Sequence, residues 1–171
     1  MKKYLLTCLI AFFFDFTSFA QAKVSAQDVA SIEAITAAGL RIISGPKGQK
    51  RDMEQFKALF LPDAQLGGVF YRGDSSFVRI TTVEQFADRN GPFYEQNGFF
   101  ELQLALRIER FGNLATAFQT YDTRYTKDGK VEARGVNTYQ LVYDKGRWWI
   151  ASLLFTPETE QQKLPAKYLK N

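Results

Sequence analysis

Few residues of this chain are suited to acid–base or nucleophilic chemistry. The sequence has no histidine, and its single cysteine, Cys8, lies in an apolar run near the start of the chain. These two facts exclude histidine triads and histidine general bases, and they remove the usual ligands of zinc, copper and haem. The glycine patterns of nucleotide-binding loops are also missing. We therefore expect no metal and no cofactor, and carboxylates remain as the candidate proton carriers.

The candidate carboxylates in strand-like runs are Glu101, Glu109 and Asp122. Residues alternate between the two faces of a strand, so Glu101 and Glu109 are expected opposite the face that carries Leu102 and the other leucines. That places them at solvent or at a subunit interface. Asp122 is then the remaining candidate for a catalytic base. Its competing interpretation is an exposed strand acid near Arg124.

Polar residues interrupt the apolar strands of the last third of the chain. An isolated polar side chain on an apolar face must find a hydrogen-bond partner, which a ligand can provide. The alternatives are a backbone group at a bulge or a bond across a subunit interface. The candidate ligand-binding residues are Tyr121, Arg134, Asn137 and Gln140.

Arg134 and Asp122 are about equally distant from the turn at Asp128-Gly129 and are expected to face each other across neighbouring strands. They would then be paired, or separated by a bound anion. Alternation alone leaves open whether they point into the fold or out of it.

The elements that must position these residues follow from hydrophobic periodicity. Three- and four-residue spacing predicts a first helix, and two shorter helices follow, capped by Asp52 and by Thr82 with Gln85. Gly91-Pro92 is expected to break the third helix. Two-residue alternation and turn residues predict the strands. The first helix is expected at 27–43, and the strands at 64–72, 77–80, 99–109, 114–126, 131–143 and 147–155.

This order predicts an α+β fold in which three N-terminal helices pack on a strongly curved antiparallel sheet. The last two strands are apolar on both faces, because Trp148 and Ile150 alternate with Trp149 and Ala151. A sheet wet on one side would show polar alternation there. A second copy of the chain is the simplest cover, which predicts a homodimer through the sheet. A loop or the C-terminal tail, with its Leu164-Pro165 and Tyr168-Leu169 patch, is the competing cover.

The N-terminus has the features of a secretory signal. Lys2 and Lys3 precede the apolar run Tyr4–Phe14, and small residues allow cleavage after Ala20 or Ala22. A buried N-terminal helix is the alternative. Cleavage would leave residues 23–171 as one domain.

The predicted location is outside the cytoplasm, in a periplasm or secreted. Export disfavours nucleic acid as a partner, and the one basic cluster, Lys47, Lys50 and Arg51, is better explained as a solvated loop. No membrane attachment is expected after signal cleavage.

The chain from residue 27 to 157 resembles the nuclear-transport-factor-2-like superfamily. The resemblance rests on the opening helix, the turn Phe56-x-x-Leu59-Phe60-x-Pro62-Asp63-Ala64, the start Phe100-Glu101, the segment Arg110-Phe111-Gly112-Asn113-Leu114-Ala115 and the two closing strands. Within this superfamily, the chain resembles an exported bacterial branch of the polyketide-cyclase-like (SnoaL-like) and ketosteroid-isomerase-like kind. The resemblance implies a pocket between the concave sheet and the helices. The dehydratase members need a histidine, which this chain lacks.

Two functions follow as expectations. The first is a small-ligand-binding or non-catalytic dimeric module whose ligand is hydrophobic or acidic. The alternative is an isomerase- or lyase-like enzyme acting on a small hydrophobic carbonyl compound, with Asp122 as base and Tyr121 or Asn137 as polariser. A pocket carboxylate with a raised pKa beside a hydroxyl or amide donor would favour the enzyme.

Overall fold

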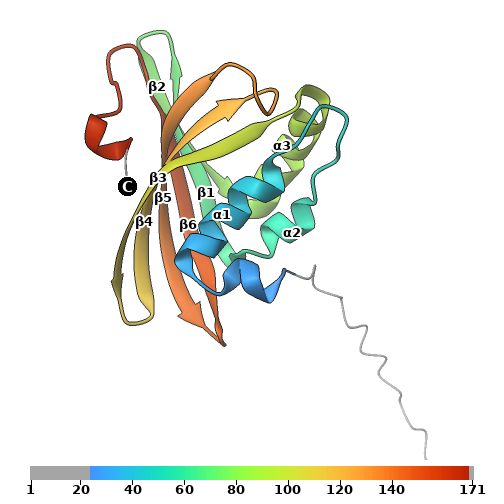
Figure 1. Ribbon diagram of the computed structural model, residues 1–171, viewed down its shortest axis with the longest axis vertical. Helices are drawn as coiled ribbons and strands as arrows, with labels where there is room; N and C mark the ends of the chain where they lie inside the picture. The colour runs from blue at the N-terminus through green and yellow to red at the C-terminus, as the bar shows by residue number, and fades with distance from the viewer. Residues whose placement is uncertain (1–23, 170–171) are drawn as a thin grey trace, which may run out of the picture.

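A computed structural model describes residues 24–169 of the chain. The predicted signal and both cleavage sites lie outside the described residues. Within 24–169, no helix is both long enough and apolar enough to cross a membrane. The predicted fold class is confirmed: helices pack on one face of a curved six-stranded sheet (Figure 1).

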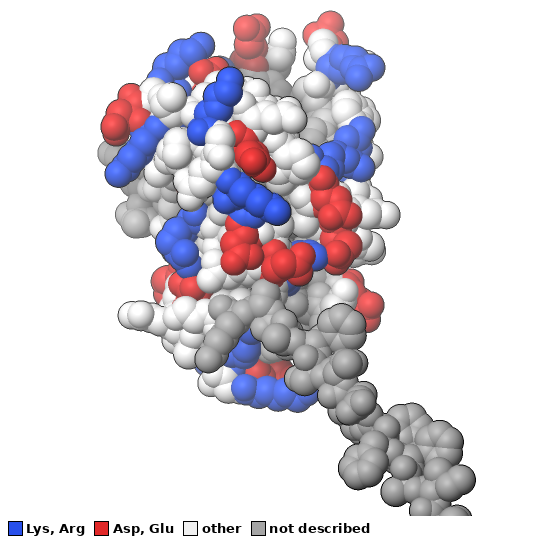
Figure 2. Space-filling model, turned by 90° about the vertical axis from the view of Figure 1, so that its right-hand side faces the viewer, with Lys and Arg blue, Asp and Glu red and all other residues white. Residues whose placement is uncertain are grey.

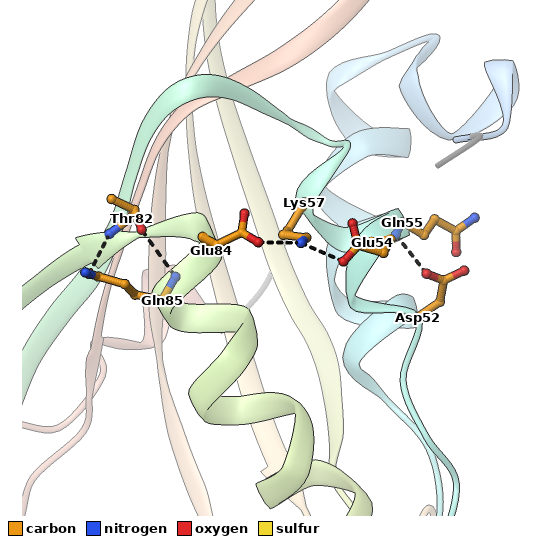
Figure 3. A network of polar contacts seen from close by, with 7 residues as sticks. All are labelled: Asp52, Glu54, Gln55, Lys57, Thr82, Glu84 and Gln85. Carbon is orange, nitrogen blue, oxygen red and sulfur yellow. Dashed lines mark hydrogen bonds and ion pairs between the residues drawn. The ribbon is translucent and has the colours of Figure 1, made fainter. Parts of the chain in front are cut away.

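The helices begin at the capping residues that the sequence indicates. Asp52 caps α2 (Met53–Lys57), and Thr82 with Gln85 forms a capping box at the start of α3 (Val83–Asn97; Figure 3). The predicted first helix is two elements, a 3-10 turn η1 (Ala26–Val29) and α1 (Ile32–Ile43), because Ser31 adopts an extended conformation and caps α1.

The predicted break at Gly91-Pro92 is wrong. Helix α3 continues through Pro92 to Asn97 and ends at Gly98, whose φ is 74°. Proline removes one helical hydrogen bond, but the second half of α3 buries Tyr94 in the core. That burial holds the helix together beyond the proline.

The sheet has the strand order β2-β1-β6-β5-β4-β3. Its neighbours pair antiparallel except for β1 and β6, which are parallel, so the expected purely antiparallel sheet is corrected. These two strands are far apart in the sequence, and no hairpin fixes their relative direction. The strands are β1 (Phe60–Arg72), β2 (Ser75–Thr82), β3 (Phe100–Phe111), β4 (Leu114–Arg124), β5 (Ala133–Asp144) and β6 (Arg147–Pro157).

The inner face of the sheet lies under the helices and carries the core. The C-terminal tail, with the 3-10 turn η2 (Ala166–Tyr168), lies on the opposite, outer face (Figure 1). There the Tyr168 ring packs against Phe118 in a tilted arrangement at 4.6 Å between centroids, and the Arg107 guanidinium lies over Tyr168 at 5.6 Å. The tail is thus one cover of the outer face, on β3 and β4.

A buried arginine joins the helices at the loop that follows α1. Arg51 is 4 % exposed, and its guanidinium donates to five backbone carbonyls, those of Ile43, Gly45, Pro46, Gln49 and Tyr94. These carbonyls belong to the end of α1, to the loop and to α3. Arg51 therefore fixes the two helices relative to each other.

The charged side chains on the helical side are mixed in sign (Figure 2). Lys57 of α2 contacts Glu54 at 2.6 Å and Glu84 of α3 at 2.8 Å (Figure 3). Neighbouring charges on this face therefore neutralise one another, and Lys57 links α2 to α3 at the surface, whereas Arg51 links α1 to α3 in the interior.

Candidate functional site

A cavity of about 290 Å³ lies between the helices and the inner face of the sheet. Seven phenylalanines and three tyrosines contribute to its wall, and Glu101 is the only charged residue among those that line it within 24–169. The volume is at the small end of the range for ligand pockets, about 300–1,000 Å³. The space suits a compact apolar molecule with one polar group.

A β-bulge in β3 brings Glu101 into this cavity. The register with β4 shifts between Gln103 and Ala105, so that Leu104 is an extra residue without a partner. One extra residue reverses the alternation, and Glu101 lies on the same face as Leu106, which packs against the core. The expectation that Glu101 faces solvent or a subunit interface is therefore wrong.

Glu101 is the end of a chain of side-chain hydrogen bonds across three strands. Asn137 Nδ2 donates to Glu101 Oε1 at 3.1 Å and to Gln119 Oε1 at 3.2 Å. The Tyr139 hydroxyl donates to the same Gln119 oxygen at 2.8 Å, and Gln119 Nε2 donates to Gln103 Oε1 at 2.9 Å. These bonds hold the side-chain amides of Gln119 and Asn137 each in one orientation, and the Asn137 amide points at the carboxylate of Glu101.

Burial governs the protonation of this wall. It raises the pKa of Glu101 to about 7, and the hydrogen bond from Asn137 opposes that rise. The Glu101 side chain borders the cavity and so keeps some accessible surface, although protein surrounds it elsewhere. Burial, followed by the nearby charge of Glu101, raises the pKa of Tyr121 and of Tyr139, which stay neutral hydroxyls.

Tyr121 takes its place in the cavity because its cross-strand neighbour is a glycine. Gly135 is its partner in the β4–β5 register, and a Cβ at this position would clash with the Tyr121 hydroxyl and with the Thr156 carbonyl. The phenol ring lies over this bare backbone and lines the cavity. Its hydroxyl is available as a neutral hydrogen-bond donor.

The structure divides the residues predicted for the site between the two faces of the sheet. Tyr121 and Asn137 line the cavity. Asp122 is 2 % exposed but belongs to the outer face, where Arg124 holds both of its carboxylate oxygens at 2.9 and 3.1 Å. Asp122 is therefore not a base of this cavity, and the cavity carboxylate is Glu101, which was expected on the opposite face.

Arg134 and Gln140 are exposed on the outer face and do not line the cavity. The expected register is correct, since Asp122 and Arg134 are direct partners across β4 and β5, but the ion pair of Asp122 is with Arg124. A polar cavity wall built around Arg134, Asn137 and Gln140 is thus reduced to Asn137. Ligand contact by the other two stays a prediction, for the outer face.

No protein-family model matches this sequence, and no curated protein is a significant match. Solved structures are similar. A protein of unknown function with a cystatin-like fold from Nostoc punctiforme has a TM-score of 0.58 at 14% identity, over 81% of this chain and 97% of that one.

Two further solved structures have comparable similarity. A protein from Silicibacter pomeroyi that is described as nuclear-transport-factor-2-like, of unknown function, has a TM-score of 0.52 at 15% identity, over 75% of this chain and 94% of that one. A hexachlorocyclohexane dehydrochlorinase, LinA Type2, has a TM-score of 0.50 at 14% identity, over 80% and 93%. Identities this low show the fold alone, and the fold is shared by proteins with different roles. The chain has the fold of the nuclear-transport-factor-2-like superfamily.

Proposed function

We propose that this protein binds a small, largely apolar molecule in the cavity, with the polar group of the ligand against Glu101 and Asn137. The observation that carries the proposal is the convergence of a carboxylate and its amide donor on one wall of a largely apolar space. Ligand pockets typically combine such an apolar lining with a few placed polar groups. The hydrogen-bond chain through Gln119 fixes those groups before any ligand arrives.

Two asparagines of α3 give a matched test. Asn90 lines the cavity and Asn97 is exposed, and each donates to the carbonyl four residues earlier at 2.9 Å. Asn90→Trp would fill part of the cavity, whereas Asn97→Trp would not. We expect the fluorescence of the neutral probe N-phenylnaphthylamine to rise on binding to the native protein and to Asn97→Trp, and to stay low with Asn90→Trp.

Equal binding by the two variants would place the probe elsewhere on the surface. No binding by the native protein, together with no small molecule retained in native mass spectrometry of protein from its own host, would contradict the proposal.

Proton-transfer catalysis on a small carbonyl compound is a second candidate, favoured by the feature expected of such an enzyme: a cavity carboxylate, Glu101, with its pKa near 7 beside the amide donor of Asn137. A base is most effective when its pKa lies near the working pH. Glu101 would take a proton from the carbon beside the carbonyl group, and the electrons of that C–H bond would form an enolate. The Tyr121 hydroxyl, which also lines the cavity, would donate to the enolate oxygen, and return of the proton to another carbon would give an isomer. Glu101 thus replaces Asp122 as the proposed general base.

The enzyme candidate is tested with a small β,γ-unsaturated ketone whose isomerisation is followed by absorbance. Glu101→Gln should abolish turnover, and Glu109→Gln, on the same strand but exposed, should not change it. The rate of the native protein should rise with pH and level off above about 7. Turnover that survives in Glu101→Gln would remove the enzyme candidate and leave the binding proposal intact.

We further propose that the mature chain acts outside the cytoplasm, after cleavage behind Ala20 or Ala22. The support is the basic start, the short apolar run and the small residues of the sequence. N-terminal sequencing of the protein from its own host should give a chain that begins at Gln21 or Lys23. A chain that retains Met1 or Lys2 would contradict export by this route.

A further inference from the structure

We propose that the ligand of this cavity is an organic cation, an amine or quaternary ammonium group on an apolar skeleton, with the Glu101 carboxylate as its counter-ion. This inference rests on the proposed binding function and names the ligand class. It goes against the acidic ligand that the sequence suggests through Arg134.

The charge of the cavity points to a cation. No lysine or arginine lines it, and none of the ion pairs of residues 24–169 includes Glu101. The Asn137 amide supplies a hydrogen bond but no compensating charge. A carboxylate in apolar surroundings is costly unless a charge pairs with it. A ligand cation would remove that cost, whereas a ligand carboxylate would add repulsion.

The aromatic wall points the same way. Aromatic faces carry negative potential and attract ammonium groups, and such rings recognise quaternary amines in many proteins. Tyr94, Tyr121 and Tyr139 surround the carboxylate closely enough for its charge to raise the pKa of each. Phe99 lies against Tyr94 at 4.5 Å between ring centroids and extends this wall. The same rings would cover both the charged head of an amine and its apolar skeleton.

Two arginines near the cavity form the competing site. Arg79 and Arg89 line an adjoining hollow of about 90 Å³, which shares Phe70 and Phe86 with the cavity. Both are exposed, and the Arg79 guanidinium lies over Phe70 at 5.7 Å and over Phe77 at 5.8 Å. Exposed charges are screened by solvent, so their influence on the buried carboxylate is weak. An acidic ligand would have to place its carboxylate in this hollow, beside Arg79 and Arg89.

Three probes of one shape separate these possibilities: phenylbutylamine, phenylbutanol and phenylbutyrate. Calorimetric titration at pH 8 should give an amine affinity at least about tenfold above that of the alcohol, because the amine and Glu101 are then both ionised. Below the pKa of Glu101 the amine affinity should fall about tenfold per pH unit, because only the ionised carboxyl pairs with it. The alcohol affinity should change little.

Glu101→Gln keeps the shape of the side chain and removes its charge. It should lower the amine affinity to that of the alcohol and abolish its pH dependence, while the alcohol still binds. Glu109→Gln, exposed on the same strand, is the control and should behave as the native protein.

The inference is overturned if the alcohol binds as tightly as the amine. It is also overturned if the acid binds most tightly and loses affinity in Arg79→Gln and Arg89→Gln. In either case binding in the cavity stands. If none of the three probes binds and N-phenylnaphthylamine also fails, the proposed function itself fails.

Discussion

A single carboxyl group, that of Glu101, couples the cavity to the stability of the fold. Its pKa is about 7 in the folded protein and near 4.5 in an unfolded chain. The folded state therefore binds more protons than the unfolded state between these values, and the free energy of unfolding should fall as pH rises from about 4.5 to 7 and then level off. A carboxyl that borders a cavity is partly screened, so the expected loss is about 1–3 kcal/mol.

Urea unfolding at pH 5, 6, 7 and 8 measures this loss. Glu101→Gln should remove this part of the pH dependence and be more stable than the native protein at pH 8, because it leaves no buried charge. Glu109→Gln should keep the native pH profile. An identical profile in the native protein and in Glu101→Gln would show that the pKa of Glu101 is close to its ordinary value.

Two glycines should respond in opposite ways to alanine substitution. Gly135→Ala would place a methyl group against the Tyr121 ring and the Thr156 carbonyl, and overpacking of this kind costs about 1–3 kcal/mol. Gly39 lies inside α1, and its added Cβ would be 4.0 Å from Leu59. Gly39→Ala should stabilise the protein by about 0.5–1 kcal/mol, because alanine favours the helix.

Thermal unfolding of the two variants checks this contrast. Gly135→Ala should also weaken probe binding, since Tyr121 has to move. Equal stability of the two variants would contradict the proposed packing of Tyr121 over Gly135.

At the scale of single residues, part of the candidate site could be predicted from the sequence. Tyr121 and Asn137 were predicted because polar side chains interrupt apolar strands, and both line the cavity. Glu101 was placed on the wrong face because strict alternation assumes an unbroken register. The run Leu104-Ala105-Leu106, three apolar residues in succession, is the one local sign of the bulge. Such a run fits a doubly buried strand equally well, so only the pairing with β4 distinguishes the two.

At the scale of elements, the hydrogen bonds from Arg51 to the backbone of α1, the loop and α3 should contribute more to stability than any surface ion pair. Arg51→Lys keeps the charge but loses the planar fork that reaches carbonyls of α1, the loop and α3 at once. Buried carbonyls left without donors each cost about 1–3 kcal/mol, so we expect a loss of at least about 2 kcal/mol. Lys50→Ala, at an exposed neighbour in the same loop, should change stability by less than about 0.5 kcal/mol.

Chemical denaturation gives both values, and N-phenylnaphthylamine binding shows whether the helices still cover the cavity. If Arg51→Lys is as stable as Lys50→Ala, the loop is held by other contacts and the role of Arg51 is wrong.

The same scale shows why some elements were predicted and others were not. The starts of α2 and α3 depend on short-range hydrogen bonds from Asp52 and Thr82, which sequence spacing reveals directly. The continuation of α3 beyond Pro92 depends on burial of Tyr94, and the parallel pairing of β1 with β6 depends on how the whole sheet closes. Long-range packing of this kind cannot be predicted from the local sequence pattern.

At the scale of the whole molecule, the two faces of the sheet have different covers. The helices cover the inner face, and the tail covers the outer face at Phe118 of β4. On the other half of the outer face, Val78, Ile80 and Leu154 are 68%, 47% and 40% exposed. Ile80 and Leu154 both pair with Gly67 and form one row across β2, β1 and β6. Because Gly67 has no side chain, the exposed side chains of this row, Ile80 and Leu154, are both apolar.

We expect a second copy of the chain to cover this apolar row, in a dimer through the sheet. Exposed apolar groups in one row are an unfavourable surface for a monomer, and two such rows can pack on each other. Light scattering at micromolar concentration should give twice the mass of one chain. Ile80→Lys with Leu154→Lys should give a monomer, because the charges cannot be buried unpaired. Phe111→Lys, at a hairpin tip that is 91% exposed, should remain a dimer.

Removing the C-terminal tail tests which of the two predicted covers, a second copy of the chain or the tail, shields the outer face of the sheet. Removal of residues 158–171 would expose Phe118 but would leave Val78, Ile80 and Leu154 as they are, so we expect the shortened chain to stay dimeric. A native monomer would contradict the dimer, and a dimer formed only after tail removal would assign the tail as a competing cover. Cavity binding measured on each form would then show whether the outer face influences the inner one, since Asn137 and Gln140 lie on opposite faces of the same strand.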